Sequence, residues 1–239
     1  MGEEVPCAAQ GGYDREGEAV ICFLGDSHAA ETLRAAAIAN GLVITNEHDA
    51  RLVFIAQDTP TNEAGVRNLA FIDTFVKTAW TGVPIILTSQ VPPGFTRKLG
   101  EHTKNVFHMA ETLRMKDAMS RAIRPEQFII GVPDPKEYTL PTEFMTYMYA
   151  HKPHAVHIMS YEEAEFAKIA INMFLAAQVD TTNRLAAAAA KVGANWGAVA
   201  NALRSDSRIG PKAYLEPGRW QESRHLLRDH VTLEEILAR

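Results

Sequence analysis

A turn at residues 25–30, with the sequence GDSHAA, offers the first recognisable chemistry in this chain. It follows a short apolar run and precedes an alanine-rich helical pattern, which is the setting of a dinucleotide-binding turn. Such turns carry glycine at their first, third and sixth positions, which here hold Gly25, Ser27 and Ala30. Gly25 suits the tight turn and Ala30 suits close helix–strand packing, whereas the side chain of Ser27 stands where pyrophosphate approaches the backbone. The alternative is that Asp26 or Ser27 simply caps the helix.

An acid that binds the ribose hydroxyls of a dinucleotide is expected about 20 residues after the first glycine. Glu47 lies near that distance, directly after an apolar strand pattern at 42–45. The next strand pattern, at 52–56, follows almost at once and leaves no room for a helix. The sequence therefore predicts that one strand–helix unit of an ordinary nucleotide-binding half is missing.

Three histidines spaced by three, His151, His154 and His157, are the remaining candidates for metal chemistry. Pro153 prevents a shared helix, and in a strand His154 and His157 face opposite sides. We therefore predict no metal site.

The elements that must position these residues alternate between strand and helix up to about residue 160. Helical spacing of apolar residues or alanine richness predicts helices at 28–40, 66–80 and 141–151. The continuous apolar run at 19–24 predicts a strand buried on both faces, and further apolar runs predict strands at 42–45, 52–56, 84–89, 128–132 and 154–159. This alternation indicates an α/β fold with a mostly parallel sheet.

The second half of the chain is predicted to be helical. Residues 161–192 contain neither proline nor glycine, which predicts one helix too long for a small domain, and a shorter helix follows within 193–205. Thr232, with a carboxylate three residues later, is typical of a capping box and predicts a last helix over 232–239.

Composition limits the class of protein. With 239 residues, 46% of them hydrophobic and 22% charged, the chain is large enough for a substantial core. The net charge of −5 favours neither a nucleic-acid partner nor an anionic membrane, and no apolar run approaches the roughly 20 residues needed to cross a bilayer.

Two cysteines, Cys7 and Cys22, exclude a disulfide framework and favour a reducing, cytoplasmic location. Residues 1–18 are polar and acidic, unlike a signal peptide, and are expected to form a flexible lead-in.

Five segments, in order, resemble the UDP-glucose/GDP-mannose dehydrogenase family. They are similar to that family's Gly-Thr-Pro turn, Val-Pro-Pro-Gly turn, Pro-Asp-Arg-Ile segment, long central helix and the region after it. In this sequence they are FIAQDTP (54–60), LTSQVPPGFTRKL (87–99), IRPEQFIIG (123–131), the helix 160–183 and residues 192–218.

The resemblance implies a reduced Rossmann-like dinucleotide-binding domain over 19–159 and an all-helical middle domain over 160–239. It further implies NAD as cofactor, a nucleotide sugar or similar small molecule as substrate, and a homodimer formed through 161–192. The chain ends at Arg239, just after the middle domain, so most of the family's C-terminal domain is expected to be absent.

The same resemblance assigns roles to individual residues. Lys168 and Asn172 match the lysine and asparagine that stabilise an oxyanion, and they lie four apart on one helix, hence on one side. Glu111 and Asp229 match the family's catalytic glutamate and its aspartate. The cofactor site is expected to comprise Gly25, Ser27, Ala30, Glu47, Thr59 and Pro60.

Two positions depart from the family pattern. The family oxidises a primary alcohol twice, using a cysteine thiolate to hold the aldehyde, and ungapped counting from Pro217-Gly218 puts His225 at the cysteine's position. Gln90 stands where the family has a threonine.

Two hypotheses remain open. The chain is either an NAD-dependent oxidoreductase limited to the first, alcohol-to-aldehyde step, or a non-catalytic homologue that acts as a dimeric scaffold or regulatory subunit. Lys168, Asn172 and Asp229 favour the first hypothesis; Ser27, Gln90, His225 and the missing strand–helix unit favour the second.

Overall fold

A computed structural model describes residues 20–78, 82–102 and 105–239, so the expected lead-in at 1–18, Cys7 and the end of the helix predicted at 66–80 lie outside the described residues. The fold is α/β, with one seven-stranded sheet in the order β2-β1-β3-β4-β5-β6-β7. Strands β1 to β5 are parallel, and β6 and β7 run together in the opposite direction. The strands are β1 (Val20–Leu24), β2 (Val43–Ile44), β3 (Leu52–Ile55), β4 (Ile85–Leu87), β5 (Val106–Met109), β6 (Gln127–Val132) and β7 (Ala155–Ser160).

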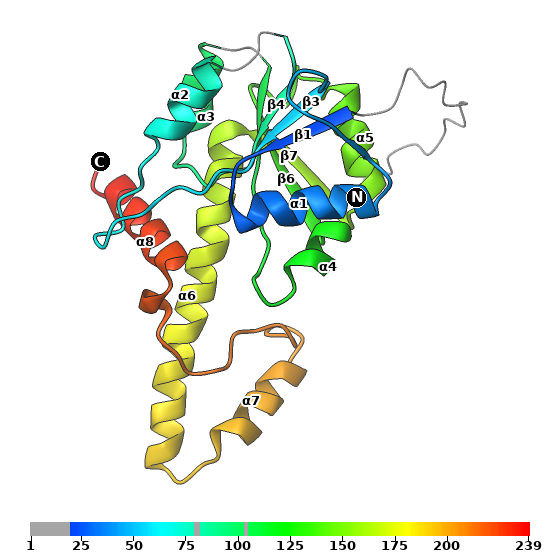
Figure 1. Ribbon diagram of the computed structural model, residues 1–239. Coiled ribbons are helices and arrows are strands. Elements are labelled where there is room, and N and C mark those ends of the chain that lie inside the picture. Colours follow the sequence, from blue (N-terminus) through cyan, green and yellow to red (C-terminus); the bar gives the residue numbers. More distant parts are fainter. Residues whose placement is uncertain (1–19, 79–81, 103–104) are drawn as a thin grey trace.

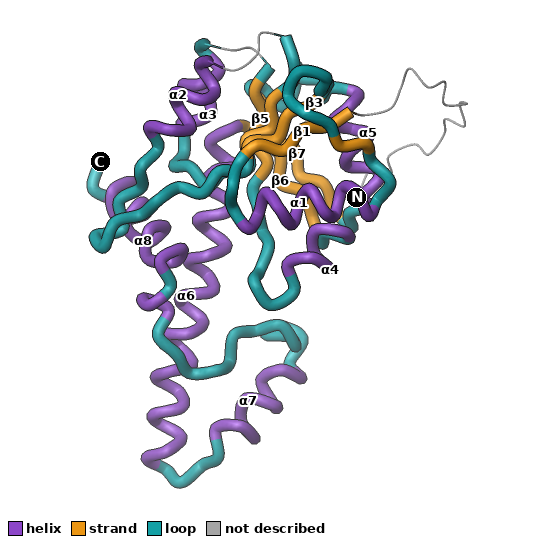
Figure 2. Tube along the Cα trace, viewed as in Figure 1, coloured by secondary structure: helices purple, strands orange, loops and turns teal. Residues whose placement is uncertain are grey.

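Helices cover both faces of this sheet, and a long helix leads away from it (Figure 1). The helices are α1 (His28–Ala39), α2 (Ala70–Thr78), α3 (Phe95–Gly100), α4 (Ala118–Ile123), α5 (Thr142–His151), α6 (Tyr161–Lys191), α7 (Trp196–Ser205) and α8 (Arg224–Leu237). Figure 2 shows the same division, with the strands gathered at one end and only helices and loops at the other. Within the described residues, no helix is both long and apolar enough to span a membrane.

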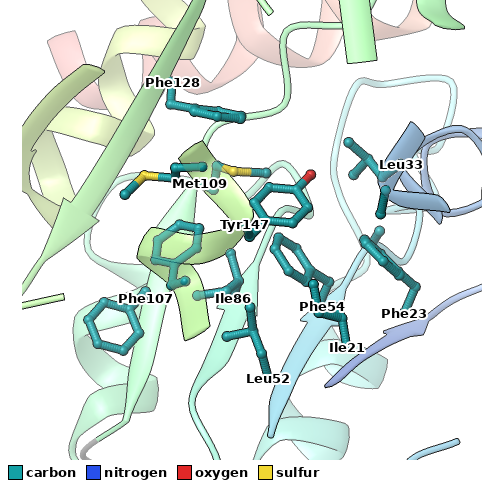
Figure 3. Packing of buried hydrophobic residues seen from close by; sticks show 14 of the residues in the cluster. Ile21, Phe23, Leu33, Leu52, Phe54, Ile86, Phe107, Met109, Phe128 and Tyr147 are labelled. Carbon is teal, nitrogen blue, oxygen red and sulfur yellow. The ribbon is translucent and has the colours of Figure 1, made fainter. Parts of the chain in front are cut away.

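The core explains why the central strands are continuously apolar. Every residue of β3 and β4 is buried, because helices pack on both sides of them. On the α1 and α5 side, Phe23 and Phe54 stack at 4.8 Å and Tyr147 lies 4.5 Å from Phe54, measured between ring centroids (Figure 3). On the other side, the neighbouring strand residues pack against α2 and α3. This two-sided core fixes the carboxyl ends of the strands, from which the functional loops extend.

Strand β5 is an element that the sequence patterns do not predict. Its four residues, VFHM, are all buried, and they include His108. A histidine in a short run hides the apolar signal of a core strand. Burial without a compensating partner lowers the pKa of His108 to about 4, so the ring is neutral inside the sheet.

The strand–helix unit that the sequence lacks is also lacking in the fold. Residues 45–51 connect β2 directly to β3 without a helix, and β2 is an edge strand of two residues. An ordinary doubly wound sheet has a third strand outside the second. The prediction of a reduced Rossmann-like sheet is confirmed.

The long helix α6 has 31 residues, and its bounds agree with the predicted 161–192. Ser160 and Glu163 form a capping box at its first turn. Further along, the buried carboxylate of Glu165 accepts hydrogen bonds from the N–H groups of Gly94 and Thr96, at 2.5 and 2.8 Å, and so ties α3 to α6. Because the first turns of α6 pack on β5, β6 and β7, the division into two domains at residue 160 stays a prediction.

The predicted start of the last helix at Thr232 is wrong. Helix α8 begins at Arg224, and Thr232 lies inside it with its hydroxyl donating to the carbonyl of Arg228 at 3.0 Å. The preceding residues RHLLRD are mostly polar and carry no local helix signal. Two of them, Arg228 and Asp229, are buried by partners far away in the sequence, which a local pattern does not reveal.

Candidate active site

A cleft of 840 Å³ lies at the carboxyl ends of β1, β3, β4 and β5, where open α/β sheets bind ligands. Its walls come from the loops that follow those four strands, from one face of α6 and from the first turn of α8. The loop segments that line it are 26–29, 56–58, 88–90 and 111–115. Residues almost 200 positions apart in sequence thus share one space.

The turn after β1 has the geometry that its glycine predicts. Gly25 has φ +124°, and a Cβ there would lie 2.7 Å from the carbonyl oxygen of Ala56. Ser27 is the N-cap of α1, accepting from the N–H of Ala30 at 3.1 Å, and its hydroxyl also donates to the Ala56 carbonyl. The capping alternative therefore holds for Ser27. Asp26 accepts a hydrogen bond of 2.8 Å from the amide of Gln57 across the cleft.

The other expected cofactor residues lie away from the cleft. Glu47 is exposed beyond β2, and Pro60 is exposed after β3. Thr59 is buried, where its hydroxyl accepts from a guanidinium N–H of Arg228 at 2.9 Å. None of these three lines the cleft, and neither do Gly25 and the fully buried Ala30, so Ser27 is the expected cofactor residue that the structure places in its wall.

Four of the expected catalytic residues, by contrast, converge on the cleft: Glu111, Lys168, Asn172 and His225. Glu111 follows β5, Lys168 and Asn172 lie one turn apart on α6, and His225 is in the first turn of α8. The carboxylate of Glu111 accepts from the N–H of Leu113, which holds it in its own loop. The four side chains come from three elements and face one volume.

Two side chains of the cleft, Lys168 and His225, have pKa values below their ordinary ones. Removal from water lowers the pKa of Lys168, while the nearby carboxylates of Glu111 and Asp229 act in the opposite direction. Removal from water, followed by the positive charge of Arg228, lowers the pKa of His225, while Asp58 and Glu111 oppose that shift. The imidazole of His225 is thus neutral at pH 7 and can accept a proton.

Asp229, the fifth expected catalytic residue, lies behind this wall. Its side chain is completely buried and is not among the residues that line the cleft. The Asn172 amide donates to it at 2.6 Å, the Gln90 amide donates to both of its oxygens at 2.6 and 2.5 Å, and the Arg67 guanidinium forms an ion pair with it. Asp229 is therefore separated from the cleft by Asn172 and Gln90, which both line it.

Gln90 links this carboxylate to a second buried cation. Its amide oxygen accepts from the guanidinium of Arg228, while its amide nitrogen donates to Asp229. Threonine is too short to bridge the two. Sequence reasoning identified Gln90 only as a departure and missed Arg67 and Arg228, because their partner lies some 140 to 160 positions away.

Comparison with known proteins finds relatives in both sequence and fold. Residues 162–232, which supply α6, α7 and most of α8, match the UDP-glucose/GDP-mannose dehydrogenase family, central domain. The chain is 30% identical over 182 residues to the UDP-glucose 6-dehydrogenase TuaD of Bacillus subtilis, a match that covers 70% of this chain and 38% of that protein. The chain thus spans less than half the length of this curated relative.

Solved structures show the same fold. A UDP-glucose dehydrogenase from the hyperthermophilic archaeon Pyrobaculum islandicum superposes with a TM-score of 0.67 at 20% identity, covering 95% of this chain and 66% of that one. The 3-hydroxyisobutyrate dehydrogenase of Mycobacterium tuberculosis superposes with a TM-score of 0.61 at 15% identity, covering 92% and 87%. The fold therefore extends over nearly the whole chain.

Proposed function

Because this chain belongs to the UDP-glucose/GDP-mannose dehydrogenase family, we propose that it oxidises an alcohol group of a nucleotide sugar, or of a similar small molecule, to an aldehyde with NAD. The observation that supports this most is the convergence of Glu111, Lys168, Asn172 and His225 on one cleft at the carboxyl ends of the sheet. Four polar groups suited to proton transfer and oxygen binding surround the space where the alcohol would lie.

The turn after β1 fits the phosphates of a dinucleotide. Gly25 lets the turn pass close to the backbone of Ala56, and the 12-residue helix α1 points its N-terminus at the cleft. The N–H of Ala30 donates to the hydroxyl oxygen of Ser27. The N–H groups of His28 and Ala29 lie in the first turn of α1, where the helix offers them no carbonyl, so they can bind an anion. When bound there, NAD supplies the hydride acceptor of an alcohol oxidation.

The side chains of the cleft then divide the remaining work. The neutral imidazole of His225 accepts the hydroxyl proton, and the C–H hydrogen leaves as hydride, so that the carbon–oxygen single bond becomes a carbonyl. The ammonium of Lys168 stabilises the negative charge that develops on the oxygen, and Glu111 keeps that ammonium charged. Asn172, oriented by Asp229, donates the second N–H of its amide to the same oxygen.

Among the described residues no cysteine lines the cleft, and this limits the reaction to one oxidation. Cys22, the cysteine within the described residues, is buried in β1, and burial raises its pKa. Imidazole does not form the thioester-like intermediate that a second hydride transfer needs. With a free thiol in the core and NAD as oxidant, we place the reaction in the cytoplasm.

Counting NADH per molecule of product tests this proposal. The full chain is incubated with NAD and, in separate arms, UDP-glucose, GDP-mannose and 3-hydroxyisobutyrate, and the product is identified by mass spectrometry. We expect one NADH and one aldehyde per sugar nucleotide, and two NADH and a carboxylate for His225→Cys. No NADH in any arm, from either protein, would contradict the proposal.

We also propose that the chain forms a homodimer through α6. Phe174, Leu185 and Val192 have 75%, 46% and 80% of their surface exposed. Spacings of eleven and seven place the three on one stripe, which runs from the middle of α6 to Val192, the residue just after its end. An apolar stripe of this length is typical of a helix that packs against another copy.

A non-catalytic scaffold is the second candidate, and one observation favours it. Asp26 places a carboxylate beside the N-terminus of α1, where the phosphates of NAD would lie. Such a scaffold would dimerise without binding NADH, so a binding titration separates it from the enzyme.

A further inference from the structure

Strand β2 stops short of the cleft. It pairs with β1 only through Val20↔Val43 and Ile21↔Ile44, whereas β1 continues for three more residues to Leu24 before the turn. At about 3.3 Å per residue, β2 therefore ends roughly 10 Å before the carboxyl end of β1.

An Asn-centred turn accounts for this early end. The side-chain oxygen of Asn46 accepts from the N–H groups of His48 and Asp49, at 2.9 and 3.3 Å. The chain then turns back, and the N–H of Arg51 donates to the carbonyl of Val20 at 2.8 Å, beside the beginning of β1. The segment 45–51 thus returns along the sheet and does not rise to its ligand-binding edge.

The consequence concerns one half of the cofactor. In doubly wound sheets the ribose of the adenosine half lies at the carboxyl end of the second strand, where an acidic side chain accepts hydrogen bonds from the ribose hydroxyls. Here Glu47 is exposed, and its ion pair is with its neighbour His48 at 3.8 Å. Among the described residues of 42–51, none lines the cleft.

The other half of the cofactor has a complete setting. The N-terminus of α1 opens on the cleft, where it can receive phosphates, and the loops after β3 and β4 and the face of α6 continue the wall from there. We propose that this chain recognises its cofactor through the nicotinamide mononucleotide half, and that the adenosine half contributes little affinity. This inference rests on the proposed function, since it concerns the same cleft.

Fluorescence titration of the full chain with NADH and with reduced nicotinamide mononucleotide tests the inference, since the two ligands share the same fluorophore. We expect dissociation constants within about threefold of each other. NADH binding more than about thirtyfold tighter would overturn the inference while leaving the proposed function intact. If neither ligand binds at millimolar concentration, both the inference and the proposed function are wrong.

Two variants sharpen the titration. Glu47→Gln is expected to leave the NADH affinity within twofold, whereas loss of an acid that accepts ribose hydroxyls would weaken it about tenfold or more. Gly25→Ala is the positive control, because its Cβ would meet the Ala56 carbonyl, and it should weaken both ligands alike. Circular dichroism melting of each variant confirms that it is folded. A tenfold loss of NADH affinity in Glu47→Gln, with the mononucleotide unaffected, would contradict the inference.

Discussion

The buried carboxylate of Asp229 allows a quantitative test of how the cleft wall is held together. Asp229→Asn keeps the shape of the side chain but removes its charge, and the amide must present a donor to at least one of three existing donors, from Arg67, Gln90 and Asn172. Breaking a buried ion pair on one side costs about 3–5 kcal/mol, because the remaining cation is left uncompensated. At about 2–4 °C per kcal/mol for a chain of this size, the melting temperature should fall by roughly 6–20 °C.

Urea unfolding followed by tryptophan fluorescence measures this change. The midpoint should fall while the dependence of the unfolding free energy on urea concentration stays the same. Asp58→Asn is the matched control: Asp58 lies 3.8 Å from Arg228, the other buried arginine of the network, but is itself 62% exposed, so its loss should cost at most about 1 kcal/mol. If Asp229→Asn costs no more than Asp58→Asn, the network does not hold the wall and the reasoning is refuted.

Three further predictions concern the cleft and the dimer. The pH profile of kcat/KM should be bell-shaped, because falling pH protonates His225 and rising pH deprotonates Lys168. The midpoints of the two limbs should lie below the ordinary pKa values of histidine and lysine, 6.5 and 10.5. If the His225→Asn variant keeps the acid limb, the imidazole is not the base. Gln90→Glu should destabilise the protein by about 1–3 kcal/mol in the same urea assay, because it opposes Asp229 with a second carboxylate, whereas unchanged stability would argue against the bridge. Light scattering should give about twice 26.4 kDa for the native chain and a monomer for Phe174→Glu, and a native monomer would count against the dimer.

Local patterns in the sequence were sufficient to predict those elements whose own residues carry the signal for a strand, helix or turn. The apolar runs of β1, β3 and β4, the uninterrupted α6 and the Gly25 turn all appear where the sequence predicts them. The short connection after β2 likewise follows from chain length alone.

The parts that the sequence did not predict depend on distant partners. The first two turns of α8 contain Arg228 and Asp229, which are polar in sequence but buried in the fold by Gln90, Arg67 and Thr59. Strand β5 was hidden by His108, which is neutral only because the sheet surrounds it. Neither periodicity nor composition carries such information, since the compensating group is not a neighbour along the chain.

Family resemblance identified the residues of the candidate site better than it identified the role of each residue. It brought Glu111, Lys168, Asn172 and His225 to one cleft, although nothing in the local sequence joins them. It also suggested Asp229 as a catalytic group, whereas the side chain is buried behind Asn172 and engaged by three neighbours. Gln90 first looked like a loss, yet in the fold it replaces a short hydroxyl by an amide that bridges two buried charges.

Calorimetric titration of the full chain with NAD and with NADH tests the central claim, that the cleft is a dinucleotide site, most directly. The account predicts saturable binding of both, with one site per chain. Absence of binding by both ligands at millimolar concentration would contradict it and leave the scaffold as the remaining function.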